Sequence, residues 1–139
     1  TFSACFGAPF LPLAPSRYSE MLGKRIKEHD AQVYLVNTGW TGGPYGEGER
    51  IQLTYTRAMV NAALSGNLDN ADFKPHPVFH VEVPTSCPGV PSEVLDPKNT
   101  WKDKDNYDKS ARALALRFNR NAEQLRDIPS EIMTANPQA

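Results

Sequence analysis

The chain has 139 residues, of which 40% are hydrophobic and 22% are charged, as expected for one soluble globular domain. Its formal net charge is −1, so we expect neither nucleic acid nor an anionic membrane as a partner. No apolar stretch of the sequence approaches the ~20 residues that cross a bilayer, and residues 1–3 do not resemble the start of a signal peptide.

Two cysteines, Cys5 and Cys87, are far apart and belong to no Cys-x-x-Cys motif. We therefore expect a reducing compartment and two small buried side chains rather than a disulfide framework. The chain begins with Thr1 and enters an apolar segment at once, so we expect a piece of a longer protein. Its last residues contain no peroxisomal tripeptide, which favours a cytoplasmic location.

The N-terminal third predicts an irregular segment, a helix and a strand. Residues 2–13 mix aromatic residues with glycine and proline and fit neither period, so an irregular buried segment is expected. Pro15 suits the first turn of a helix that ends near residues 29–30, because that turn does not use the missing N–H. The apolar run at 33–36 predicts the following strand. The apolar positions of the helix are Tyr18, Met21, Leu22 and Ile26.

The middle of the chain predicts two strands around a helix. Residues 50–55 alternate apolar and polar side chains, which is the period of a half-buried strand. Thr56 is expected to be the N-cap of a helix at 57–64, because its hydroxyl can accept from the free N–H groups of the first turn. A second alternating run at 78–83 predicts another strand, which Pro84 ends.

The C-terminal third predicts a long loop, a long helix and a tail. Prolines recur through residues 84–100 and indicate an ordered loop. A helix is expected from about Asp105, and residues 127–139 are expected to form a tail. The fold class is therefore α/β (mixed α+β), with short strands, flanking helices and long ordered loops. The apolar positions of the long helix are Tyr107, Ala111, Leu114, Phe118, Ala122 and Leu125.

A glycine-rich stretch, residues 42–48, separates the strand at 33–36 from Arg50. A phosphate-binding loop would end in Gly-Lys-Ser or Gly-Lys-Thr and lead into a helix. Here the stretch leads into a predicted strand, and Glu47 and Glu49 place carboxylates where phosphates would lie. The pattern favours a structural hairpin over a ligand-binding loop, because glycine runs commonly form turns.

Arg50, Ile51 and Thr56 follow this loop and combine a planar array of donors, an apolar side chain and a hydroxyl. Such a set suits the edge and face of a purine. The alternative is a solvated arginine beside a helix-capping threonine, which the pattern alone favours because such triplets are common.

No other motif of the sequence indicates a catalytic or metal centre. His76 and His80 are four residues apart, but Pro75 and Pro77 prevent the helix that would bring them together, and zinc needs three or four convergent ligands. No serine, histidine and aspartate, and no cysteine and histidine, form a recognisable catalytic arrangement. The sequence therefore predicts no catalytic residue and no metal ligand.

Several long and unusual blocks of the sequence point to a family. They are TFSACFGAPFLPL (1–13), YLVNTGWTGGPYGEGERI (34–51), YTRAMVNAALSGNLDN (55–70), VPTSCPGVPSEVLDPKNTW (83–101) and the helix at 107–118. Together they resemble ATP-dependent phosphoenolpyruvate carboxykinase, in the C-terminal portion of its catalytic domain. The resemblance implies that residues 1–126 are the C-terminal part of that nucleotide-binding domain and that 127–139 are its tail.

Members of this family convert oxaloacetate and ATP to phosphoenolpyruvate, ADP and carbon dioxide in gluconeogenesis, with Mg²⁺ and Mn²⁺ neutralising the phosphate charge. Their R-I-x-x-x-x-T stretch contacts the adenine end of ATP. It matches Arg50, Ile51 and Thr56 of this chain. The resemblance thus implies that Arg50 lies against the base or its edge, that Ile51 flanks the base, and that Thr56 forms a hydrogen bond to it.

The family's phosphate loop, its metal-binding His, Asp and Lys and its oxaloacetate-binding arginine lie upstream of the matched portion. We therefore expect the N-terminal portion of the same enzyme as a partner, and no carboxykinase activity from these 139 residues alone. One alternative is a non-catalytic module that binds a nucleotide or another protein. Another is a structural piece in which Arg50 only forms a surface ion pair.

Overall fold

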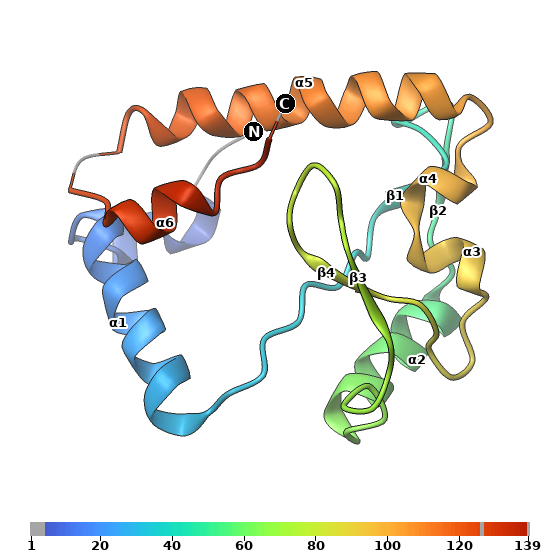
Figure 1. Ribbon diagram of the computed structural model, residues 1–139, viewed down its shortest axis with the longest axis horizontal. Coiled ribbons are helices and arrows are strands. Elements are labelled where there is room, and N and C mark those ends of the chain that lie inside the picture. The colour runs from blue at the N-terminus through green and yellow to red at the C-terminus, as the bar shows by residue number, and fades with distance from the viewer. Residues whose placement is uncertain (1–4, 126, 139) are drawn as a thin grey trace.

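The computed structural model describes residues 5–125 and 127–138 and confirms a mixed α/β chain of helices and short antiparallel strands (Figure 1). Strand β1 (Trp40–Thr41) pairs with β2 (Glu49–Arg50), and β3 (Phe73–Pro75) pairs with β4 (Glu82–Pro84). The helices are the 3-10 helix η1 (Cys5–Phe10) and α1 (Pro15–His29), α2 (Leu53–Leu64), α3 (Ser92–Leu95), α4 (Pro97–Thr100), α5 (Lys104–Ala122) and α6 (Ser130–Thr134).

The two long helices predicted from periodicity are confirmed. Helix α1 has Pro15 in its first turn, and Asp30 ends it in the left-handed conformation with φ 47°, its N–H donating to the carbonyl of Ile26. Helix α5 is capped by Asp103, whose carboxylate accepts from the N–H groups of Asp105 and Asn106 at 2.9 and 3.0 Å. Both helices therefore begin and end where the local chemistry of the sequence directs them.

The predicted strand at 50–55 is wrong beyond Arg50, and Thr56 is not a helix N-cap. Helix α2 begins at Leu53 after Gln52, whose carbonyl accepts from the N–H groups of Tyr55 and Thr56 at 3.0 and 3.1 Å. The alternation of apolar and polar residues imitated a strand. The ladder with β1 ends at Trp40 and Arg50, so residues 52–55 have no strand partner among the described residues, and residues 53–55 join α2 instead.

Other predicted strands and loops also differ from the structure. Residues 33–36 are extended but belong to no strand of the described chain, and of the run at 78–83 only Glu82 and Val83 fall within β4, because a turn occupies residues 77–79. The loop at 84–100 contains the one-turn helices α3 and α4. The segment predicted to be irregular at 2–13 contains η1, and its residues 2–4 lie outside the described part of the chain.

The core lies where α2 meets the extended segment and the loop that follows β4. It is formed by the buried side chains of Ala62, Leu68 and Cys87, so the expectation of a buried Cys87 is confirmed, whereas the side chain of Cys5 lies outside the described residues. The partly buried apolar residues around this core are Tyr34, Met59, Ala63, Ala71, Val90 and Leu95. This cluster packs α2 against the segment that contains Tyr34 and against the loop that contains Cys87 and Val90.

The surface of the chain is too large for a compact protein of its mass. Its accessible area is 10569 Å² at 15.4 kDa, whereas a compact monomer of that mass exposes about 7,200 Å². Large apolar side chains contribute to the difference: Leu22 on α1 is 62% exposed and Leu35 in the extended segment is 86% exposed. In Figure 1, α1 runs along an open side of the molecule, away from α2, α3 and α4.

Of the described residues, no helix combines the length and the apolar character that crossing a lipid bilayer would require.

His76 is part of a structural hydrogen-bond cluster and not of a histidine pair for a metal. Its Nδ1 accepts from the N–H groups of Val78 and Phe79, both at 3.2 Å, so the single ring proton lies on Nε2, 2.8 Å from the hydroxyl oxygen of Tyr107. Both ring nitrogens of His76 thus have hydrogen-bond partners within the protein. Burial raises the pKa of Tyr107 to about 12, and the negative charges of Asp96 and Asp108 add to the effect.

Protonation of His76 should destabilise the fold. Burial lowers the pKa of His76 below its usual 6.5; Asp96 opposes this shift and His80 adds to it. Because the folded state favours the neutral ring, this stability is fully present above pH 6.5 and is lost as the pH falls through the lowered folded-state pKa. We expect urea unfolding between about pH 8 and about pH 5 to show this loss.

The control for this prediction is His76→Asn, whose side-chain oxygen can still accept from the two backbone N–H groups but does not titrate. The difference in unfolding free energy between wild type and variant should shrink as the pH falls. A difference that stays constant across the range would show that His76 does not carry this pH dependence.

Candidate functional site

The glycine-rich stretch is the turn of the β1–β2 hairpin, as the pattern favoured. The N–H groups of Glu47 and Gly48 donate to the carbonyl of Pro44 at 3.1 and 2.9 Å and close the turn. Gly46 has φ 94°, and a Cβ at Gly48 would lie 2.7 Å from the backbone nitrogen of Gly43. Glycine is therefore required here by the backbone itself, without reference to any ligand.

One hydroxyl joins this hairpin to helix α4. The Thr100 hydroxyl donates to the carbonyl of Pro97 at 2.8 Å and accepts from the N–H of Gly42 at 3.0 Å. Its oxygen also lies 2.7 Å from the hydroxyl of Thr41, which must be the donor because the Thr100 proton is already used. The start of the glycine turn is thus held in one position relative to α4.

Arg50 ends the hairpin and lies across from Trp40. Its guanidinium carbon is 6.0 Å from the centre of the Trp40 ring, within the range of a cation–π interaction. The ring of Tyr45 packs edge-on against Trp40, with the ring centres 5.1 Å apart. The charged end of Arg50 therefore lies over the Trp40 ring at the open end of the hairpin, and Tyr45 packs against that ring.

Ile51 and Thr56 continue from this point into α2. The N–H of Ile51 donates to the carbonyl of Gly39 at 2.9 Å, and its side chain is half-buried. Thr56 is also half-buried and lies in the first turns of α2. The chain thus brings all three predicted residues to one hairpin-to-helix junction. The three residues are not gathered around one cavity. The chain has a cavity of about 730 Å³ that is lined by Ile51 but not by Arg50 or Thr56.

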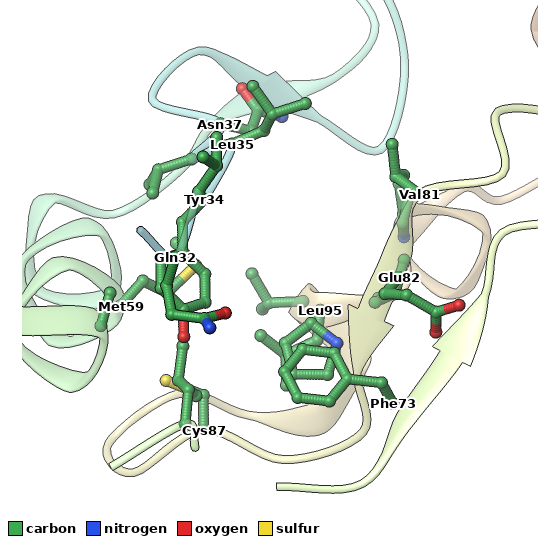
Figure 2. A pocket seen from close by; sticks show the side chains of 18 of the residues that line it. Gln32, Tyr34, Leu35, Asn37, Met59, Phe73, Val81, Glu82, Cys87 and Leu95 are labelled. Atoms are coloured by element: carbon green, nitrogen blue, oxygen red, sulfur yellow. The ribbon is translucent and has the colours of Figure 1, made fainter. Parts of the chain in front are cut away.

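Figure 2 shows this cavity of about 730 Å³ from close by. The extended segment, with Gln32 and Asn37, forms one side, and Val81 and Glu82 of the second hairpin lie on the other side, as Figure 2 shows. The lining is mainly apolar and includes Tyr34, Leu35, Met59, Phe73 and Leu95. Apolar side chains of a neighbouring protein segment suit such a space better than phosphate groups do.

Metal-ligating side chains do not converge in the part of the chain that the structure describes. Among residues 5–125 and 127–138, no group of three or more His, Cys, Asp and Glu is placed to hold a metal ion. Burial raises the pKa of the Cys87 thiol, which keeps it in its unreactive protonated form. What the arrangement can do is bind: Arg50 offers a fork of donors, and Ile51 offers an apolar surface beside it.

Sequence reasoning missed Trp40, Tyr45 and Thr100. Trp40 could have been found by counting outward from the glycine turn, since a hairpin places residues at equal distances from its centre opposite one another. Thr100 gave no such signal, because it lies 59 residues from Thr41 and only the tertiary fold brings their hydroxyls together.

Comparison with known proteins places this chain in a family. The sequence profile described as phosphoenolpyruvate carboxykinase matches residues 1–93. The chain is 60% identical over 137 residues to phosphoenolpyruvate carboxykinase (ATP) 2 of Moorella thermoacetica. It is 57% identical over 138 residues to phosphoenolpyruvate carboxykinase (ATP) of Caldanaerobacter subterraneus subsp. tengcongensis, and 53% identical over 139 residues to that of Thermus thermophilus.

These alignments cover 99% of this chain but only 26% of each relative, so the chain spans about a quarter of the length of the curated relatives it matches. Identity above 50% over almost the whole chain, together with the family profile over its first two thirds, leaves no other assignment. The chain belongs to the phosphoenolpyruvate carboxykinase (ATP) family.

Proposed function

We propose that this chain supplies the adenine-binding side of the ATP site in an ATP-dependent phosphoenolpyruvate carboxykinase. The enzyme would convert oxaloacetate and ATP to phosphoenolpyruvate, ADP and carbon dioxide in gluconeogenesis, in the cytoplasm. Residues 1–126 would be the C-terminal part of its catalytic domain and 127–139 its tail. The observation that carries the proposal is the near-complete match of this chain to relatives with that name.

The position of Arg50 supports the adenine role. A guanidinium at the exposed end of a hairpin presents N–H donors to the ring nitrogens at a purine's edge. Ile51 adds an apolar surface for the face of the base, and the hydroxyl of Thr56 can donate or accept one hydrogen bond. The three side chains would thus recognise the base and leave the phosphates to other groups.

The metal chemistry would be supplied from outside this chain. The family resemblance implies Mg²⁺ and Mn²⁺, but the described residues contain no set of side chains that fits such an ion. No reaction step is therefore assigned to residues of this chain. Their part in the reaction is to hold one end of ATP so that its phosphates reach groups carried elsewhere.

The partner proposed is the rest of the same enzyme, and the apolar segment at 33–36 supports one way for it to bind. The side chains of Val33 and Leu35 are 63% and 86% exposed, and all four residues of the segment line the cavity of about 730 Å³. A run that is apolar on both faces is typical of a strand covered on both sides. We infer that a strand from the rest of the carboxykinase pairs with this segment and that its side chains help to fill the cavity.

A second candidate function is a non-catalytic module that binds a nucleotide or a protein. The large exposed apolar surface favours a binding partner, and the described residues hold no cluster of side chains that could bind a metal ion. The two candidates differ in one outcome: only the carboxykinase proposal requires that the chain restore phosphoenolpyruvate formation when it is combined with the rest of such an enzyme.

Replacing Arg50 should weaken ATP binding more than it slows the chemical step. We expect Arg50→Ala, in a carboxykinase that contains this chain, to raise the KM for ATP about tenfold, since a charged donor to the base is lost, with kcat changed much less. The matched control is Arg57→Ala, which removes an exposed cation from α2. An unchanged KM for ATP in Arg50→Ala would contradict the adenine role.

The strand-pairing proposal can be tested by complementation. This chain would be co-expressed with the part of the Moorella thermoacetica enzyme that lies outside the matched 137 residues, and phosphoenolpyruvate formation would be measured. We expect activity from the pair and none from this chain alone. Leu35→Pro should abolish assembly because it removes a backbone N–H from the segment, whereas Leu35→Ala, which keeps that N–H, should weaken assembly only in part.

Two outcomes would contradict these expectations about activity and assembly. Phosphoenolpyruvate formation by the 139-residue chain alone would show that the chain is sufficient for catalysis. Assembly of Leu35→Pro to the same extent as Leu35→Ala would show that the segment does not pair as a strand and that only its apolar surface matters.

A further inference from the structure

The register of the β1–β2 hairpin brings the side chains of Trp40 and Arg50 together. The N–H of Ile51 donates to the carbonyl of Gly39, so these two residues form a hydrogen-bonded pair at the open end of the hairpin. In an antiparallel ladder the next pair, Trp40 and Arg50, is then non-hydrogen-bonded, and its Cα atoms lie about 4.5 Å apart. Such pairs hold their side chains closest and on one face of the sheet.

The contact leaves the guanidinium free to bind a ligand. The ion pairs of the described residues are Arg17–Glu20, Lys24–Glu28, Arg25–Glu28 and Lys98–Asp108, and Arg50 is in none of them. Glu47 and Glu49 are close in sequence but do not pair with it. A cation over an aromatic face is held without using its N–H groups as donors to an acceptor. The donors of Arg50 are thus restrained in position but not consumed.

We propose that Trp40 is a positioning residue for Arg50, that Tyr45 fixes the Trp40 ring from its edge, and that this aromatic pair sets the guanidinium against the adenine base. The proposal rests on the proposed function of Arg50. A long flexible side chain loses rotamer freedom when it binds. The Trp40 ring restricts that freedom before ATP arrives, and the preorganised guanidinium therefore binds the base more tightly.

The test is a double-mutant cycle in a carboxykinase that contains this chain. Trp40→Leu removes the ring and should raise the KM for ATP about three- to fivefold, as expected for an exposed cation–π contact, without a matching change in the KM for oxaloacetate. Trp40→Phe keeps an aromatic face and should restore most of the loss. In the Arg50→Ala background, Trp40→Leu should have no further effect on the KM for ATP, because Trp40 acts through Arg50.

NMR of the unmodified carboxykinase gives a first test that does not depend on whether a variant folds. The ring current of Trp40 should shift the NMR signals of the Arg50 side chain upfield, and addition of ATP should perturb the same signals. Tyr45→Leu should reduce the ring-current shift, because the edge contact that holds the indole is lost.

The outcomes separate the two proposals. A raised KM for ATP in Arg50→Ala with no change in Trp40→Leu would overturn the positioning role and leave the adenine site standing. Additive effects of the two substitutions would also overturn it, since Trp40 would then act independently of Arg50. The same holds for unshifted Arg50 signals. If Arg50→Ala itself leaves the KM for ATP unchanged, the proposed function fails.

Discussion

The hydroxyl of Thr100 is the point on which the geometry of the candidate site depends. It accepts from the N–H of Gly42 and from the hydroxyl of Thr41, and it donates to the carbonyl of Pro97, so one atom joins the hairpin to the last turn of α4. Helix α4 in turn is tied to α5 by the ion pair of Lys98 and Asp108, with a separation of 2.7 Å. A two-residue ladder cannot hold its position alone, since isolated hairpins are marginal in water. The contacts from α5 to α4, and from the Thr100 hydroxyl of α4 to the hairpin, hold the hairpin in place.

The second constraint is the small amount of core that the chain can make for itself. The buried apolar side chains of the described residues are Ala62, Leu68, Cys87, Ala111, Ala115 and Ala122, none larger than leucine. Such side chains bury little area each. The helices and hairpins are therefore defined largely by local features, namely caps, turns and hydroxyl contacts. Large apolar side chains such as Leu35 stay exposed.

The sequence predicted the features whose causes are local. The apolar period and Pro15 were enough to place α1, the cap at Asp103 and the same period define α5, and the clustered glycines correctly indicated a hairpin. The strand at 33–36 was not confirmed because a strand needs a neighbour, and none of the described residues pairs with it. Helix α2 was misjudged at its start because the ladder with β1 already ends at Arg50, which the alternation of side chains does not reveal.

The residues of the candidate site also divide into those that the sequence predicted and those that only the fold reveals. Arg50, Ile51 and Thr56 were found from their side-chain chemistry and from a short motif of the family resemblance, whereas Trp40 depends on hairpin register and Thr100 on a contact across 59 residues. The three predicted residues carry the donors and the apolar surface of the proposed site, but neither their orientation nor their restraint can be read from the motif. Those come from the turn: because Gly46 and Gly48 let the backbone reverse sharply, Trp40 returns to lie beside Arg50. In the proposed site, the glycines of this loop would thus contribute to adenine binding through the position of Arg50, and no phosphate contact is assigned to them.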